Sequence, residues 1–234
     1  MVNGVLVLDK PKGLTSAQVV QRIKNKFHFH KVGHGGTLDP LATGVLPICI
    51  NQATKISSWL LGADKVYEGV FLLGVETDTQ DVLGKVVATY PEIASGVTEV
   101  EVCAAMAKFQ GPLQQVPPMY SAIKKGGKPL YRYARANQEV EREPRQIHIF
   151  DFKFLGKVGN EVEFRVHCSK GTYVRTLCSD VGKELKSGAC VKELKRVRTG
   201  NCELSQAIAL EALSLENLTK LPHWKTIAEI RPLC

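Results

Sequence analysis

The strongest constraint on this chain is the glycine-rich stretch GHGGTLDPLATG at residues 33–44. Glycines at three of its first four positions permit backbone conformations that other residues cannot adopt. Pro40 disfavours a helical conformation at Asp39, so the carboxylate is expected on a turn with a fixed direction of entry. The stretch therefore predicts a loop that presents one acid beside the imidazole of His34. Taken alone, the Asp-Pro pair is more typical of a plain turn or a helix cap than of a catalytic acid, so other residues must decide.

Composition predicts a cytoplasmic globular protein. A chain of 234 residues with 44% apolar content can bury roughly 70 to 75% of its unfolded surface. The apolar run Val5–Leu8 is too short for a signal peptide, and no apolar segment is long enough to span a membrane. The cysteines form no CxxC pair and are odd in number, which indicates reduced core thiols. They are Cys49, Cys103, Cys168, Cys178, Cys190, Cys202 and Cys234.

The charge of the chain favours a polyanionic partner. Lysine and arginine number 31 against 23 acidic residues, which gives a net charge of +8 and a pI near 9.1. The basic residues gather in two segments, 124–145 and 192–198. This distribution predicts a track for nucleic acid rather than an evenly solvated surface.

The first third of the chain alternates between strands and helices. Residues 5–8 predict a strand, and the capping box Thr15-Ser16-Ala17-Gln18 opens a helix with Val19, Val20, Ile23 and Phe27 on one face. A strand at 45–50 and a helical turn or two at 56–61 follow the glycine-rich stretch. The next strand, at 65–73, carries Tyr67.

The rest of the chain continues this mixture. A second capping box, Thr98-Glu99-Val100-Glu101, precedes a helix with Val102, Met106 and Phe109 in register. Residues 147–155 and 161–168 predict a hairpin through the Gly159-Asn160 turn, and the helix that follows has Arg175 in its first turn. No repeat or linker divides the chain. We therefore expect a single mixed α/β domain over 1–234, with an excursion at about 115–145 and an unplaced tail at about 221–234.

Several motifs in order along the chain give it a close resemblance to the TruB-type tRNA pseudouridine synthases of bacteria. They are GVLVLDKP at 4–11, the stretch at 33–44, ATK at 53–55, DKVY at 64–67, PMYSA at 118–122, residues 168–176 and residues 188–196. The resemblance implies the α+β pseudouridine synthase fold, with a central, mainly antiparallel sheet flanked by helices. It also implies isomerisation of the uridine at tRNA position 55, in the T-loop, with no metal and no cofactor.

By this resemblance, three residues carry the chemistry. Asp39 is the catalytic carboxylate, Tyr67 stacks on the target base, and Arg175 pairs with Asp39. Isomerisation breaks the N1 glycosidic bond, turns the uracil and rejoins it through C5, so a carboxylate must act as nucleophile or base. A guanidinium beside a buried acid favours its charged form. Without the motif around it, Arg175 would be interpreted as a surface phosphate contact or as a plainly solvated charge.

The resemblance also assigns supporting residues. His34 fills the space that the flipped base leaves, and Tyr173 and Leu194 line the uracil pocket. Lys10 and Lys55 lie near the active site, although a solvated or phosphate-facing charge suits them equally. Without the family pattern, His34 would be solvent-facing and Leu194 ordinary core. The segment at 115–145 resembles the insertion with which these enzymes grip the T-arm of tRNA.

Two departures from the family pattern bear on these expectations. Position 35 is glycine where the family commonly has threonine, which loosens the loop around His34. The bacterial members usually carry a C-terminal PUA domain that binds RNA, and the chain stops about where that domain would begin. We expect no PUA domain, and we expect a monomer because nothing in the sequence suggests an obligate dimer.

Two other functions remain as alternatives. A retaining glycosidase would pair Asp39 with Glu68 or Glu76. Strand alternation, however, places Glu68 on the other face of the strand from Tyr67, and the chain has few tryptophans for stacking on sugars. An RNA chaperone would bind and flip tRNA bases, with the chemistry incidental. This second alternative is compatible with the synthase.

Overall fold

The computed structural model describes residues 2–220 and 222–230, whose contacts form two compact units. The first unit combines 1–68 with 193–234, and the second is the intervening segment 69–192. Strands β4 (Lys65–Leu73) and β12 (Ala189–Thr199) have residues in both units. The single domain over 1–234 stays a prediction. Among the described residues, no helix has the length and apolar content needed to cross a membrane.

The first unit is built on a central pair of buried strands. Strand β1 (Gly4–Lys10) runs antiparallel to β3 (Thr43–Ile50), from Gly4 opposite Ile50 to Lys10 opposite Gly44. The strand order is β14-β1-β3-β12, and β3 runs parallel to β12. Short strands pair with this core: β2 (Val32–His34) with β3, β13 (Cys202–Glu203) with β12, and β14 (Ile208–Ala209) and β15 (Trp224–Lys225) with β1. The sequence did not reveal β2.

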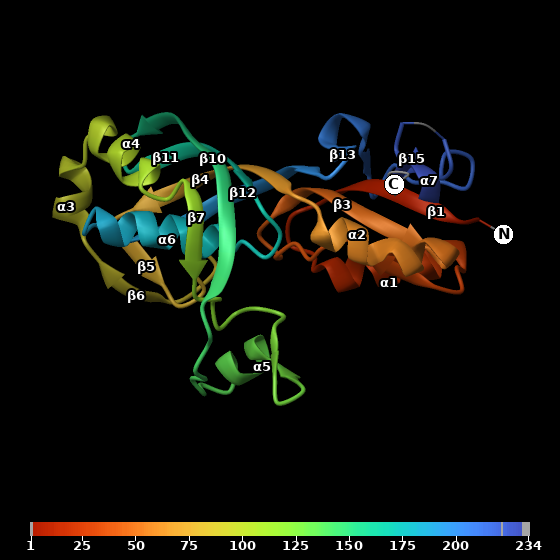
Figure 1. The fold of residues 1–234 in the computed structure, drawn as a ribbon, viewed down its shortest axis with the longest axis horizontal. Coiled ribbons are helices and arrows are strands. Elements are labelled where there is room, and N and C mark those ends of the chain that lie inside the picture. Colours follow the sequence, from red (N-terminus) through yellow and green to blue (C-terminus); the bar gives the residue numbers. More distant parts are fainter. Residues whose placement is uncertain (1, 221, 231–234) are drawn as a thin grey trace. The chain divides into compact units, whose positions relative to one another are not determined.

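The first helix of this unit begins where the sequence predicts. The capping box at Thr15 is present, because Gln18 N–H donates to Thr15 Oγ1 at 3.1 Å and Thr15 N–H donates to Gln18 Oε1 at 2.8 Å. It opens α1 (Ser16–Phe27), which buries Val19 and Ile23. A 3-10 helix (Asn51–Ile56) leads into α2 (Ser57–Gly62). In Figure 1, α1 and α2 lie along one side of β1 and β3.

The tail that the sequence left unplaced is partly structured. Strand β15 pairs antiparallel with β1, with Leu6 opposite Trp224 and Val5 opposite Lys225. Helix α7 (Ile227–Ile230) follows and buries Ile230. The remaining residues of this tail, 221 and 231–234, lie outside the described part of the chain. Pairing with β1 therefore ties the described end of the chain to its beginning.

In the second unit the strand order is β4-β11-β10-β7, and β10 runs antiparallel to both β11 and β7. Strands β10 (Arg145–Val158) and β11 (Glu161–Cys168) form the expected hairpin, and Gly159 adopts φ +57° in its turn. Alternate residues of β11 are buried, as predicted, from Val162 to Cys168. Strand β7 (Gly111–Gln115) pairs antiparallel with β10. Strands β5 (Val75–Thr77) and β6 (Val86–Thr89) form a separate pair.

Three helices accompany this sheet: α3 (Pro91–Gly96), α4 (Glu99–Ala107) and α6 (Val174–Glu184). The capping box at Thr98 is confirmed, and α4 packs against β10 and α6. The expected helical position of Phe109 is wrong, since α4 ends at Ala107. The reason is that the chain turns into β7 at Gly111, whose φ of +92° is incompatible with a right-handed helix.

The excursion between β7 and β10 has a small structure of its own. Strands β8 (Lys124–Lys125) and β9 (Lys128–Pro129) form a hairpin that leads into α5 (Leu130–Ala134). Figure 1 shows this segment beyond the ends of β7 and β10. Lys128 Nζ lies 4.5 Å from the centre of the Tyr133 ring. We call residues 116–144 the insertion from here on.

Buried cysteines agree with the expectation of core thiols. Cys49, Cys168, Cys178, Cys190 and Cys202 are free and buried, whereas Cys103 is free and exposed on α4. Cys234 lies outside the described residues. Burial raises the pKa of the Cys49 thiol to about 12, so this thiol stays protonated.

Candidate active site

Asp39 lies on the loop between β2 and β3, in a half-buried position. Its main-chain oxygen accepts the N–H of Ala42 at 3.1 Å, which closes a turn with Pro40 in the second position. The oxygen of Pro40 accepts the N–H of Gly13 at 2.8 Å. The loop thus holds the acid on a closed turn, as the sequence predicts, and the strand-to-helix connection after β1 supports that turn.

Two side chains from other elements hold the loop on either side of Asp39. Ser16 Oγ accepts the N–H of Leu38 at 2.8 Å and donates to the oxygen of Leu38 at 3.1 Å. Asp9 Oδ1 accepts the N–H of Gly44 at 3.1 Å. Buried main-chain groups that are satisfied in this way resist local unfolding. The carboxylate of Asp39 is therefore presented by a rigid support.

The glycines of the loop are required for different physical reasons. Gly36 adopts φ +140° and Gly44 adopts φ +95°, both of which are strained for other residues. Gly35 is required for space, because a Cβ there would lie 2.5 Å from the Cβ of Leu60 on α2. The expectation of a looser loop at Gly35 is wrong. Instead, the Leu60 side chain occupies the space beside it, and that position is tightly packed.

Arg196 is a residue of this site that the sequence analysis placed elsewhere. We expected residues 192–198 to face nucleic acid, but the Arg196 side chain on β12 is only 1% exposed. Its Nε donates to the oxygen of Val45 at 2.8 Å, its Nη2 to Gly36 at 3.1 Å and its Nη1 to Thr37 at 3.3 Å. The expectation is wrong for this residue because three main-chain carbonyls, two on the loop and one on β3, accept hydrogen bonds from the guanidinium. Charge counting along a sequence does not reveal those acceptors.

Lys10 comes from the end of β1 and is fully buried. Its Nζ donates to the oxygens of Pro11 at 2.8 Å and Leu14 at 2.7 Å. Burial lowers the pKa of Lys10 to about 8, while the charge of Asp39 raises it and that of Arg196 lowers it. The structure thus brings Lys10 within electrostatic reach of Asp39. Lys55, in contrast, is exposed on the 3-10 helix before α2.

His34 ends β2 and is partly buried. Its Nδ1 accepts the N–H of Gly36 at 3.4 Å, which requires an unprotonated Nδ1. Burial lowers the pKa of His34, and the charge of Arg196 lowers it further. The imidazole is therefore neutral near pH 7, with its proton on Nε2.

Tyr67 and Leu194 are the remaining candidates in the first unit. Tyr67 lies on β4 and Leu194 on β12, and both are buried. Burial favours a pocket or a core position over a solvent-facing role for both side chains.

Arg175 and its contacts form a second cluster, inside the second unit. Arg175 is buried in the first turn of α6, as predicted. Its guanidinium donates to the main-chain oxygens of Thr79 and of Tyr120, the latter at 2.9 Å. Its Nε lies 3.8 Å from Oδ2 of Asp81, which sequence reasoning missed. Asp81 also accepts from Thr79 Oγ1 at 2.8 Å and from the N–H of Leu83 at 3.1 Å.

Tyr173 immediately precedes α6, where the main chain is pinned by a second residue that the sequence did not single out. Gln115, at the end of β7, accepts the N–H of Tyr173 through Oε1 at 2.8 Å and donates from Nε2 to its oxygen at 3.1 Å. This paired contact fixes the start of α6. Asp39 and Arg175 belong to different units, and their pairing stays a prediction.

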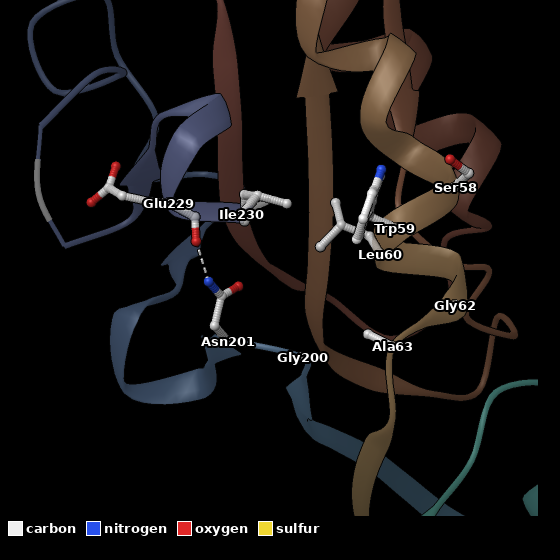
Figure 2. Close-up of a pocket in the computed structure, with 9 residues that line it drawn as sticks. All are labelled: Ser58, Trp59, Leu60, Gly62, Ala63, Gly200, Asn201, Glu229 and Ile230. Carbon is white, nitrogen blue, oxygen red and sulfur yellow. Dashed lines mark hydrogen bonds between the residues drawn. The ribbon is translucent and has the colours of Figure 1, made fainter. Parts of the chain in front are cut away.

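A cavity of about 620 Å³ lies in the first unit, away from the residues predicted to act. Figure 2 shows Trp59 and Leu60 of α2 on one side, and Asn201, Glu229 and Ile230 on the other. Asn201 Nδ2 donates to the main-chain oxygen of Glu229. None of the predicted site residues lines this cavity, so we do not assign the chemistry to it.

Comparison with protein families gives two adjoining matches. Residues 24–174 match the model for the N-terminal domain of the TruB family of pseudouridylate synthases. Residues 175–223 match the model for the C-terminal domain of tRNA pseudouridylate synthase B. Together these matches cover most of the chain.

Curated proteins that are similar to this chain are named tRNA pseudouridine synthase B. The tRNA pseudouridine synthase B of Stutzerimonas stutzeri (strain A1501) is 48% identical over 212 residues, which cover 91% of this chain and 68% of that protein. The protein of that name from Bordetella avium (strain 197N) is 47% identical over 212 residues, which cover 91% of this chain and 87% of that protein.

Solved structures agree in fold. A chain of a Cbf5-Nop10-Gar1 complex matches 90% of this chain with a TM-score of 0.70 and 33% identity. A chain of an H/ACA RNP bound to a substrate RNA containing 2'-deoxyuridine matches 90% of it with a TM-score of 0.67 and 30% identity. This chain spans about half of those chains, 53% and 52%. The mixed α/β fold with its mainly antiparallel sheet is thereby confirmed.

Proposed function

This chain belongs to the TruB family of tRNA pseudouridine synthases, which are isomerases, and we propose that it acts on the uridine at tRNA position 55, in the T-loop. The observation that carries the proposal is that several buried side chains hold the loop of Asp39 in place. The loop that bears this acid is held by Ser16, Asp9 and Arg196, beside the buried cation of Lys10. Such a preorganised carboxylate suits a reaction in which one acid performs the difficult step.

In the proposed reaction, Asp39 cleaves the N1 glycosidic bond as nucleophile or base, and the uracil then rejoins the ribose through C5. The C5 hydrogen leaves as a proton and N1 of the uracil takes up a proton, so uridine and pseudouridine contain the same atoms, and neither a metal nor a cofactor takes part. Lys10 contributes positive charge near Asp39, where it offsets the negative charge of the carboxylate. We propose that Arg175 pairs with Asp39 for the same purpose.

Base flipping assigns roles to the aromatic residues. Extruding a stacked uridine costs roughly a few kcal/mol, and stacking on an aromatic ring returns about 1 to 3 kcal/mol per base. We propose that Tyr67 supplies this stacking, with Tyr173 and Leu194 lining the uracil pocket. His34, neutral near pH 7, would fill the vacated space without placing a charge against the bases.

The insertion is proposed to grip the T-arm. Lys124, Lys125 and Arg132 are exposed on it, and Lys128 lies over the ring of Tyr133. Exposed cations beside aromatic rings suit phosphate contacts and stacking. Lys55, also exposed, is proposed as a further phosphate contact.

The family match replaces the glycosidase alternative. A chaperone activity on tRNA remains compatible with the synthase, because binding and flipping precede the chemistry. An Asp39→Asn protein that still promotes tRNA folding would establish that activity. A cytoplasmic location and a monomeric state stay predictions.

The test is release of tritium from C5 of uridine in an unmodified tRNA transcript. The chain should release about one equivalent per tRNA, and Asp39→Asn should release none. Asp151→Asn is the matched control, since Asp151 lies on β10 and contacts Lys153 at 3.4 Å. Mapping of the product should place pseudouridine in the T-loop. No release from a tRNA that the protein binds would overturn the proposal.

A further inference from the structure

We propose that Arg196 is a positioning residue whose buried guanidinium holds the Asp39 loop in its reactive shape. The inference rests on the proposed function for the role of Asp39. Arg196 is among the largest fully buried side chains in the described part of the chain. A desolvated guanidinium is costly unless its donors are satisfied, so its bonding partners indicate its purpose.

Those partners lie on both sides of Asp39. Nη2 and Nη1 donate to the oxygens of Gly36 and Thr37, which precede the acid. Nε donates to the oxygen of Val45, which follows it. One planar group therefore joins the two ends of the loop and sets the distance between them.

The main chain of Arg196 also contacts the end of the loop. Arg196 lies opposite Gly44 in the parallel pairing of β12 with β3. A Cβ at Gly44 would lie 2.2 Å from the main-chain oxygen of Arg196. This close approach, possible only for glycine, keeps the guanidinium over the loop.

The charge of Arg196 acts on two other residues of the site. It lowers the pKa of His34 and of Lys10, in both cases after the larger effect of burial. The three acceptors of its hydrogen bonds are main-chain oxygens. The fork-shaped guanidinium can donate in these three directions at once, whereas a lysine ammonium in the same place cannot reach all three.

The experiment compares the full chain with Arg196→Lys, which keeps the charge and loses the fork. Single-turnover rates and Kd are measured on a T-arm hairpin tritiated at uridine C5. A misplacement of about 1 Å can cost on the order of 100-fold in rate. We expect the rate of Arg196→Lys to fall by about 10- to 100-fold, with Kd changed by less than about 3-fold.

Hydrogen exchange provides a readout that does not depend on activity. The N–H groups of Leu38, Ala42 and Gly44 are hydrogen-bonded in the loop. In Arg196→Lys they should exchange at least about 10-fold faster, while the β1–β3 pairing from Gly4 opposite Ile50 to Leu8 opposite Leu46 keeps its protection. Val5→Ala is the control for general destabilisation, since Val5 is fully buried on β1, opposite Cys49, and makes no hydrogen bond to the loop through its side chain. It should lower the melting temperature without either effect.

The outcomes separate this inference from the proposed function. Unchanged exchange of the loop in Arg196→Lys overturns the inference, and so does a loss of rate that Val5→Ala reproduces at equal stability. A wild-type chain that forms no pseudouridine overturns the proposed function. In that case the exchange of the three loop N–H groups still decides whether Arg196 holds the loop.

Discussion

The hydroxyl of Ser16 satisfies both main-chain polar groups of Leu38. Ser16 Oγ accepts the N–H of Leu38 at 2.8 Å and donates to its oxygen at 3.1 Å. Ser16 is the first residue of α1, and Leu38 directly precedes Asp39. The start of a helix is thereby tied to the position of the proposed catalytic acid.

Ser16→Ala should impair both stability and turnover. The change leaves a buried N–H and a buried carbonyl of Leu38 without their partner, which costs about 1 to 3 kcal/mol. Because Leu38 adjoins Asp39, the single-turnover rate should also fall by about 10-fold or more. Chemical denaturation and tritium release measure the two effects.

Thr15→Ala is the control for that prediction. It removes the capping box of the same helix at a cost of about 1 kcal/mol and leaves the bonds to Leu38 intact. Its rate should stay near that of the unchanged chain. Equal losses of rate in the two variants would mean that helix stability, rather than the contact with Leu38, determines turnover.

Gly35→Ala should destabilise the first unit by about 1 to 3 kcal/mol. The new Cβ would lie 2.5 Å from Leu60 Cβ, so either the loop or α2 must move. Gly33→Ala is the matched control, because the nearest atom to its Cβ, Thr54 Cγ2, is 3.8 Å away. Melting curves that agree for the two variants would contradict the steric explanation.

Arg175→Lys should lower turnover by roughly 100-fold, with little effect on RNA affinity. Lysine cannot reproduce the fork that contacts Tyr120 and Thr79 while facing Asp81. Arg165→Lys, on the exposed face of β11, serves as the control. Normal single-turnover rates in Arg175→Lys would show that a charge without the fork is sufficient.

Because of Lys10, the free energy of unfolding should change with pH between about 8 and 10.5. The pKa of Lys10 is about 8 in the folded chain against 10.5 for an unperturbed lysine. Between these values the unfolded chain binds a proton that the folded chain does not, so the contribution of Lys10 to the free energy of unfolding rises with pH. The rise approaches about 1.4 kcal/mol per pH unit.

Urea unfolding at pH values below and inside this window measures the effect. As the pH rises from about 8 towards 10.5, the free energy of unfolding of the unchanged chain should increase relative to that of Lys10→Met. A difference that stays constant across the window would show that Lys10 does not titrate there.

RNA affinity should depend steeply on salt through the insertion. Lys124 and Arg132 are exposed there, and each phosphate contact contributes about 0.7 to 0.9 to the slope of log K against log salt. Lys124→Gln with Arg132→Gln should reduce the slope by about 1.5. Lys24→Gln with Lys31→Gln removes equal charge from the first unit and should leave the slope nearly unchanged. Slopes reduced equally by both pairs would indicate a general effect of charge.

Sequence reasoning succeeded where the signal was local. Both capping boxes, the β10–β11 hairpin and the bounds of β4 were predicted because each depends on residues a few positions apart. It failed where one side chain meets distant groups. Arg196, which was assigned to an RNA-facing track, donates a hydrogen bond to the main-chain oxygen of Gly36, 160 positions earlier. Asp81 was missed because only the fold brings it to Arg175.

Motifs, periodicity and turn residues are properties of neighbouring positions, so the family, the order of most elements and the loop that carries Asp39 could all be predicted from the chain of residues. The contacts that hold that loop became known only from the folded molecule. Whether a charge is solvated or buried depends on the acceptors that surround it, and whether a glycine is needed depends on what packs against it. Arg196 with its three carbonyls and Gly35 against Leu60 are both contacts of this kind.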